Sequence, residues 1–71
     1  MTAADHIAKC KAQALAYLGD DRMTDAVASM VDGLRQHPGT AKSESEYLAA
    51  FNLLARPDAR SAIRAWIEGV T

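Results

Sequence analysis

His6 and Cys10 are the first residues of the chain whose types and spacing could do chemistry. They stand four positions apart, so on a helix they share a face and could hold a metal ion or pair a thiol with a base. Lys9 and Lys11 flank the cysteine and could lower its pKa. A structural zinc site needs four ligands and a catalytic site three, whereas the only other histidine, His37, stands in a predicted turn. We therefore expect no metal site and a small, half-buried cysteine without reactivity.

Two pairs of carboxylates are the other candidates for acid–base chemistry, namely Asp20 with Asp21 and Glu44 with Glu46. Both pairs stand where a turn or the start of a helix favours an acid. Acid–base catalysis also needs a pocket that shifts a pKa, and a chain of this length has little volume for one. The sequence contains no nucleophile elbow, no phosphate-binding glycine loop and no metal-binding histidine motif. We therefore expect no catalytic residues, no cofactor and no enzymatic activity.

The candidate binding residues are three arginines and two large apolar side chains. Arg56, Arg60 and Arg64 are spaced by four, so they form one basic ridge if a helix begins near Arg56. Together with the preceding helix and turn, this ridge outlines a helix-turn-helix that would bind DNA. The same ridge could contact an acidic protein surface, or it could simply face solvent. Tyr17 and Leu53 fit the helical pattern least well, so each either contacts a partner or completes the edge of the core, the interpretation we prefer.

The composition is that of a small helical domain. Of the 71 residues, 49% are hydrophobic, but 15 of these are alanines, and the net charge is only −1. This balance excludes a transmembrane helix, a disulfide-stabilised scaffold, a repeat array and a multidomain enzyme. The first residues do not resemble a signal peptide, and the single cysteine cannot form an internal disulfide. We therefore expect a cytoplasmic protein that does not bind membranes.

The hydrophobic period is helical throughout and predicts one all-α domain over residues 1–71. We expect a compact bundle of four short helices. Their approximate bounds are 3–18, 22–36, 44–55 and 57–68. Thr2 and Ser43 are the expected N-caps of the first and third helices, and Gly19 and Gly69 the expected stops of the first and fourth.

Each predicted helix carries an apolar stripe that would face the core. The expected members are Ala4, Ile7, Ala8, Ala14, Leu15 and Leu18; Val27, Met30, Val31 and Leu34; Tyr47, Leu48, Phe51, Leu54 and Ala55; and Ala59, Ile63, Trp66, Ile67 and Val70. Gly33 lies inside the second pattern, where it costs about 1 kcal/mol relative to alanine. It either permits a close approach between helices or is a tolerated surface glycine.

Several segments resemble a family of small helical proteins from phages and other bacterial mobile elements. Residues 25–34 read DAVASMVDGL and residues 37–40 read HPGT, while residues 62–64 and 67–69 read AIR and IEG. The resemblance covers most of the chain from about Ala12 onward. It implies an accessory protein, and small accessory proteins of phages usually act by binding, as inhibitors of host defence such as anti-CRISPR proteins or as modulators of host transcription.

Three functional hypotheses follow. The first is a non-enzymatic interaction protein that binds a larger host protein and modulates or inhibits it. The second is a small helix-turn-helix-like DNA-binding regulator that uses the third and fourth helices. The third is a structural homodimer, because a core this lean leaves apolar surface that a second copy could cover.

Overall fold

The computed structural model describes residues 2–70 and confirms the all-α prediction. The helices are α1 (Ala3–Gly19), α2 (Met23–Gln36), α3 (Glu44–Asn52) and α4 (Ala59–Gly69), with a short 3₁₀ helix, η1 (Leu53–Ala55), between the last two. Residues 2–70 contain no strand. The predicted domain spans 1–71, and its end residues Met1 and Thr71 lie outside the described part.

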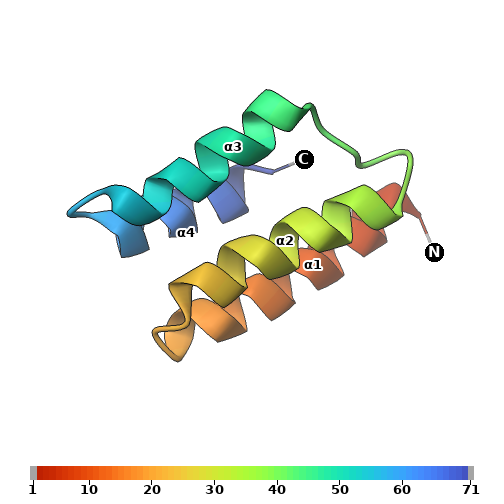
Figure 1. Ribbon diagram of the computed structural model, residues 1–71. Helices are drawn as coiled ribbons and strands as arrows, with labels where there is room; N and C mark the ends of the chain where they lie inside the picture. Colours follow the sequence, from red (N-terminus) through yellow and green to blue (C-terminus); the bar gives the residue numbers. More distant parts are fainter. Residues whose placement is uncertain (1, 71) are drawn as a thin grey trace.

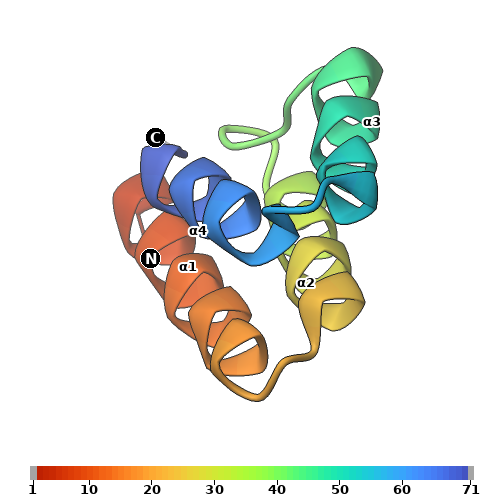
Figure 2. The same cartoon turned by 90° about the vertical axis from the view of Figure 1, so that its left-hand side faces the viewer.

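Two helical hairpins form the fold. The first hairpin is α1 with α2, and the second is α3 with α4 (Figure 1). Viewed end-on, α4 lies against both helices of the first hairpin, whereas α3 lies on the outer side of the molecule (Figure 2). Contacts join α1 to α2, α4 to both of them, and α3 to α2 and η1. The last two helices are therefore bound unequally to the first hairpin, since α4 packs on two helices and α3 on one.

The core follows three of the four predicted stripes. All four predicted residues of α2 are buried, and Met30, Val27 and Leu34 have no exposed surface. In α4, Trp66 is half-buried and the other predicted residues are buried. In α1, Ala14 and Leu18 are buried, while Ile7 and Leu15 pack at the edge. Predicted members Ala4 and Ala8 are exposed, and Cys10 takes the buried place instead.

The predicted N-caps of α1 and α3 are confirmed, and in both a side chain makes the capping hydrogen bond. The Thr2 and Ser43 hydroxyls accept hydrogen bonds from the backbone N–H groups of Asp5 and Glu46. At the end of α1, the residue in the left-handed conformation is Asp21, with φ of 62°, and not the predicted stop Gly19. Aspartate tolerates this conformation better than most residues. The turn between α1 and α2 therefore depends on an aspartate, and Gly19 remains the last residue of α1.

The junction between α3 and α4 is longer than predicted. Helix α3 ends at Asn52 and continues as η1, whereas the prediction extended one helix to Ala55. Helix α4 begins at Ala59 and not at Pro57. Arg56, the residue before Pro57, is extended with φ of −80° and ψ of 148°, as expected for a residue that precedes proline.

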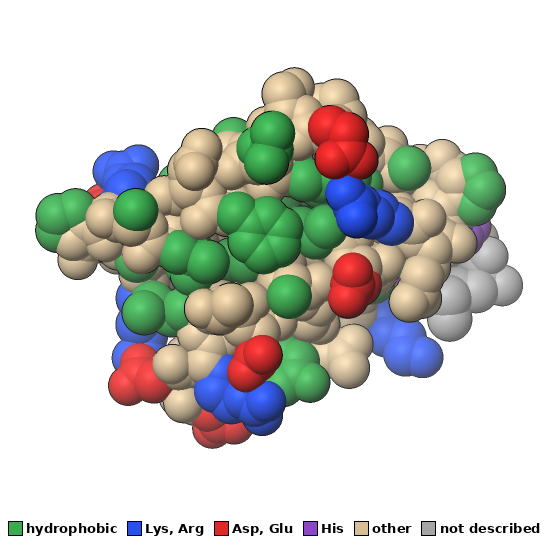
Figure 3. Space-filling view, in the orientation of Figure 1, with side chains coloured by type: hydrophobic (Ala, Val, Ile, Leu, Met, Phe, Trp, Pro, Cys, Tyr) green, Lys and Arg blue, Asp and Glu red, His purple; other side chains and the backbone are tan. Residues whose placement is uncertain are grey.

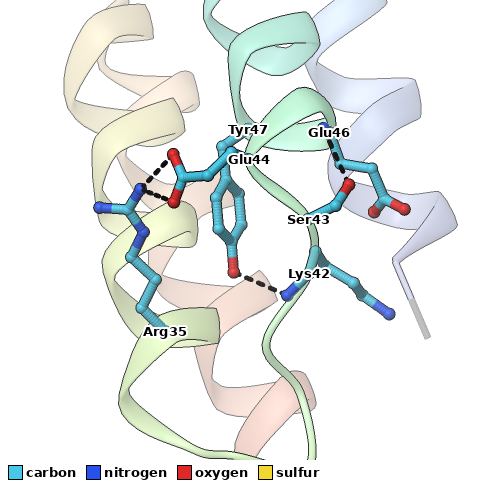
Figure 4. Close-up of polar contacts among 6 residues, drawn as sticks. All are labelled: Arg35, Lys42, Ser43, Glu44, Glu46 and Tyr47. Carbon is cyan, nitrogen blue, oxygen red and sulfur yellow. Dashed lines mark hydrogen bonds and ion pairs between the residues drawn. The ribbon is translucent and has the colours of Figure 1, made fainter.

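Helix α3 is attached to α2 at its first turn (Figure 4). The Tyr47 ring is buried, and its hydroxyl accepts a hydrogen bond of 2.8 Å from the backbone N–H of Lys42. The guanidinium of Arg35 lies over this ring, 4.8 Å from its centre, and donates to the Glu44 carboxylate at 3.0 Å. Arg35 belongs to α2, so its contact with the buried Tyr47 ring joins the start of α3 to α2, and its exposed pair with Glu44 adds little.

Thr40 is the one buried polar side chain in the described core and closes the end of α2. Its hydroxyl lies 2.9 Å from the carbonyl oxygen of Leu34 and 3.0 Å from that of His37, so its single proton is shared between them. We expect Thr40→Val, which keeps the shape and removes the donor, to lower the free energy of unfolding by about 1 kcal/mol. Urea denaturation would measure this loss. Thr24→Val is the matched control at an exposed site, and an equal effect of both changes would contradict the capping role.

Candidate protein-binding site

A groove of about 640 Å³ lies between α3 and α4. Its walls are mainly small or apolar, with polar residues at the two ends. The lining residues are Glu46, Ala49, Ala50, Leu53, Arg56, Asp58, Ser61, Ala62, Ala65 and Trp66. We call this feature the α3–α4 groove.

Alanines line much of this groove. Ala49 on α3 and Ala62 and Ala65 on α4 project no more than a methyl group, and the two helices pack on other elements more closely than on each other. The half-buried Trp66 and Leu53 supply the larger apolar surface, and both also pack against the core. The groove is therefore anchored by side chains that the fold already holds in place, a property of preformed binding sites.

The two ends of the groove differ in charge, one carrying an acid and the other an ion pair. Glu46 stands at the end formed by the first turn of α3, and Arg56 stands at the other end, after η1. Arg56 is paired with Asp58 through two hydrogen bonds of 2.9 and 3.0 Å. Both side chains of this pair are more than half exposed. Such an exposed pair is worth little to stability and can exchange for another partner.

The predicted basic ridge divides into three separate ion pairs. Arg56 lies before α4, so only Arg60 and Arg64 belong to that helix. Arg60 pairs with Asp21 at 2.9 Å, and Arg64 pairs with Glu68 at 3.0 Å. The arginines are exposed as predicted, but each stands beside a carboxylate. The charge available to attract a phosphate backbone is correspondingly reduced.

The two apolar candidates occupy different places. Tyr17 is half-buried against the core on α1, and the guanidinium of Arg22 lies 4.7 Å from the centre of its ring. Leu53 is half-buried as well, and it alone of the two lines the α3–α4 groove. The preferred interpretation, that both complete the edge of the core, agrees with these positions. Leu53 and Arg56 are thus the two predicted residues that the fold brings together in one site.

The prediction for α3 was wrong about Leu48 and Phe51. Both were assigned to the buried stripe, but Leu48 is 63% exposed and Phe51 is 39% exposed. Tyr47 and Ala50 are the buried residues of this helix. Apolar residues occur on nearly every side of α3, so periodicity alone does not choose the inner face. The sequence therefore did not predict the apolar surface that Leu48 and Phe51 expose on α3.

The side chains with potential chemistry are used for packing. His6 donates from Nε2 to the backbone oxygen of Gly33 at 2.6 Å, and Cys10 Sγ lies 3.7 Å from that nitrogen. Burial raises the pKa of the Cys10 thiol and outweighs the opposing effect of Lys9, so the alternative of a lowered pKa is not favoured. Cys10 is also buried and not half-buried. Among residues 2–70, no group of three or more histidine, cysteine or acidic side chains is arranged to hold a metal ion.

Comparison with protein-family models, with curated proteins and with solved structures finds no match for this chain. The assignment of a class therefore depends on the fold and the groove alone. They define a small all-α protein with an apolar groove between its last two helices. No helix formed by the described residues is both long enough and apolar enough to cross a membrane.

Proposed function

We propose that the protein is a non-enzymatic interaction module that binds a helical segment of a larger protein in the α3–α4 groove and thereby modulates or inhibits it. The observation that carries this proposal is the groove itself, which is preformed, lined by alanines and bordered by Trp66 and Leu53. Tryptophan is among the residues that contribute most to protein interfaces.

An amphipathic helix is the occupant that this shape favours. Helix-in-groove binding places an apolar helical face along a hydrophobic groove, and small residues in the walls let the backbones approach closely. The acid at one end also sets a direction, since a basic residue of the bound helix would pair with Glu46, whereas the other end already holds the pair of Arg56 with Asp58. The groove thus combines apolar area with a means of orienting its ligand.

The resemblance to small helical proteins of phages and mobile elements supports a host protein as the partner, with an anti-defence or regulatory role in the cytoplasm. DNA binding by α3 and α4 receives less support from the geometry. All three arginines that would contact DNA are paired with acids. An interface with a protein does not need the excess positive charge that a phosphate backbone requires.

Filling the groove tests this proposal. Ala65 is exposed and lines the groove, so Ala65→Phe should occupy it without disturbing the core. We expect the tagged native protein to recover a specific partner from host lysate and Ala65→Phe to recover at least about tenfold less, the effect of losing one interface hot spot. Ala12→Phe adds the same ring at an exposed position of α1 outside the groove, and should bind like the native protein. Equal recovery by both variants would refute the groove as the binding site.

A further inference from the structure

The exposed pair Leu48 and Phe51 forms an apolar surface that is separate from the α3–α4 groove. Neither residue lines the groove, and they are the two large hydrophobic side chains that the described residues leave exposed. They are three positions apart on α3, so they share one side of the helix, which Glu44 joins four positions before Leu48. We call Glu44, Leu48 and Phe51 the outer face of α3.

Hydrophobic side chains gather on the side of the molecule where α3 meets α2 (Figure 3). The only charged side chains of α3 are Glu44 and Glu46, and both stand in its first turn. Residues 47–55 carry no charge, and Arg56 follows them at the opposite end. Acidic residues therefore stand at one end of this apolar run and Arg56 at the other, with Arg35 paired to Glu44 and Asp58 paired to Arg56.

This order of charges favours a second copy of the chain as the partner. A second copy placed antiparallel brings the acidic end of each α3 to the basic end of the other, whereas a parallel copy would place acid on acid. The two exposed side chains also fit this arrangement. With a two-fold axis midway between them, Leu48 of each copy contacts Phe51 of the second copy, and the pair of contacts is repeated by symmetry.

We propose that two copies of the chain associate through the outer face of α3, in an antiparallel pair whose two-fold axis passes between Leu48 and Phe51. Glu44 of each copy then lies near Arg56 of the other. Their present partners, Arg35 and Asp58, are in exposed ion pairs, and the Glu44 side chain is 78% exposed. Such pairs are screened by water, so the charges can be shared with a second copy at little cost.

The small area of the outer face of α3 indicates that the dimer has a low affinity. A stable interface buries about 800 Å² per partner, and a weak one no more than about 600 Å². The whole chain exposes 4317 Å², so an interface at the upper limit of the weak class would cover about a seventh of it. Helix α3 has nine residues, and neighbouring surface of α2 must contribute to reach that area. We therefore expect a dissociation constant on the order of 10 µM, the range of weak, reversible dimers.

Sedimentation equilibrium of the full chain at 5–500 µM, a range chosen to bracket that constant at about 10 µM, tests the interface. We expect the native protein to dimerise and Leu48→Glu to weaken association at least about twentyfold, because a charge would then enter the apolar centre. Ala12→Glu adds the same charge on exposed α1 and should leave the constant unchanged. A native protein that stays monomeric throughout, or a dimer indifferent to Leu48→Glu, would overturn the proposal.

Charge exchange tests the antiparallel arrangement. Glu44→Arg and Arg56→Glu should each weaken the dimer about fivefold, and the double variant should return to within about twofold of native, as expected for a rim ion pair. Thermal melting checks folding, and Glu44→Lys replaces Glu44→Arg in the same exchange if the latter fails to fold. No recovery in the double variant would overturn the antiparallel pairing. Leu48 and Phe51 do not line the groove, so Ala65→Phe should not change the dissociation constant of the dimer, and the two proposals can fail separately.

Discussion

Replacing Gly33 with alanine should destabilise the protein by about 2 kcal/mol, although alanine is the better helix former by about 1 kcal/mol. Gly33 lies in α2 at a position that is closely approached by Cys10 of α1. A Cβ atom added to Gly33 would collide with Sγ of Cys10 and would lie 3.3 Å from its Cβ. Either Cys10 must rotate within a buried site or the two helices must separate. Overpacking of this kind outweighs the gain in helix propensity.

The contact also involves His6. The imidazole donates to the backbone oxygen of Gly33 at 2.6 Å, so a displacement of α2 from α1 lengthens this hydrogen bond as well. The glycine therefore serves a close approach between helices, one of the two interpretations that the sequence left open. A hydrogen bond from a side chain to a buried backbone oxygen contributes about 1 kcal/mol, and its loss is part of the expected effect.

Urea denaturation of four proteins measures this prediction: native, Gly33→Ala, Cys10→Ala and the double variant. Because Cys10→Ala removes the sulfur atom, Gly33→Ala should lower the free energy of unfolding less in the Cys10→Ala variant than in the native protein. We expect a coupling of about 1 kcal/mol. Gly19→Ala is the matched control, since nothing lies within 4 Å of a Cβ added there. That change should be neutral or slightly stabilising. A stabilising Gly33→Ala would show that the two helices are not in close contact.

The fold could be predicted where one side of a helix is clearly more apolar than the others. In α2, the charged residues lie off the face that carries Val27, Met30 and Leu34, and the predicted stripe is the buried one. In α3, the segment from Tyr47 to Leu54 is apolar at seven of eight positions, so its pattern allows several inner faces. Contacts with other elements choose among them. The bond from Lys42 to the Tyr47 hydroxyl and the stacking of Arg35 turn Tyr47 inward and leave Leu48 outside.

The candidate site could be predicted only in part, for a similar reason. The sequence predicted Leu53 as a binding candidate because it fits the helical pattern poorly, and Arg56 because it belongs to a row of arginines spaced by four. Both residues line the groove. Ala49, Ala62 and Ala65 also line the groove, and a small residue at one position does not indicate a groove until the residue opposite it is known. That residue belongs to another helix, so the groove is a property of the packing of α3 and α4. The ion pair between Arg60 and Asp21 is equally hidden, because 39 positions separate its members.

Replacing Ile63 with alanine should have the largest effect on stability. Ile63 is completely buried in α4, the helix that packs on both α1 and α2. Removing most of a buried isoleucine side chain costs about 2–5 kcal/mol, through lost apolar burial and the cavity that remains. A domain of this size rarely gains more than about 3–5 kcal/mol from its core. We therefore expect Ile63→Ala to leave much of the protein unfolded at 25 °C, with loss of helical circular dichroism.

The neighbouring Arg64→Ala is the matched control, because it shortens an exposed side chain of the same helix and breaks only its pair with Glu68. Its cost should stay within about 0.5 kcal/mol, as for other exposed i,i+4 pairs. Comparing Ile63→Ala with Arg64→Ala also distinguishes the two proposed binding surfaces. The groove needs α4 in place, whereas the outer face of α3 does not include it. If Ile63→Ala melts like Arg64→Ala, then α4 does not stabilise the first hairpin, and the groove loses the rigid wall on which the proposed function depends.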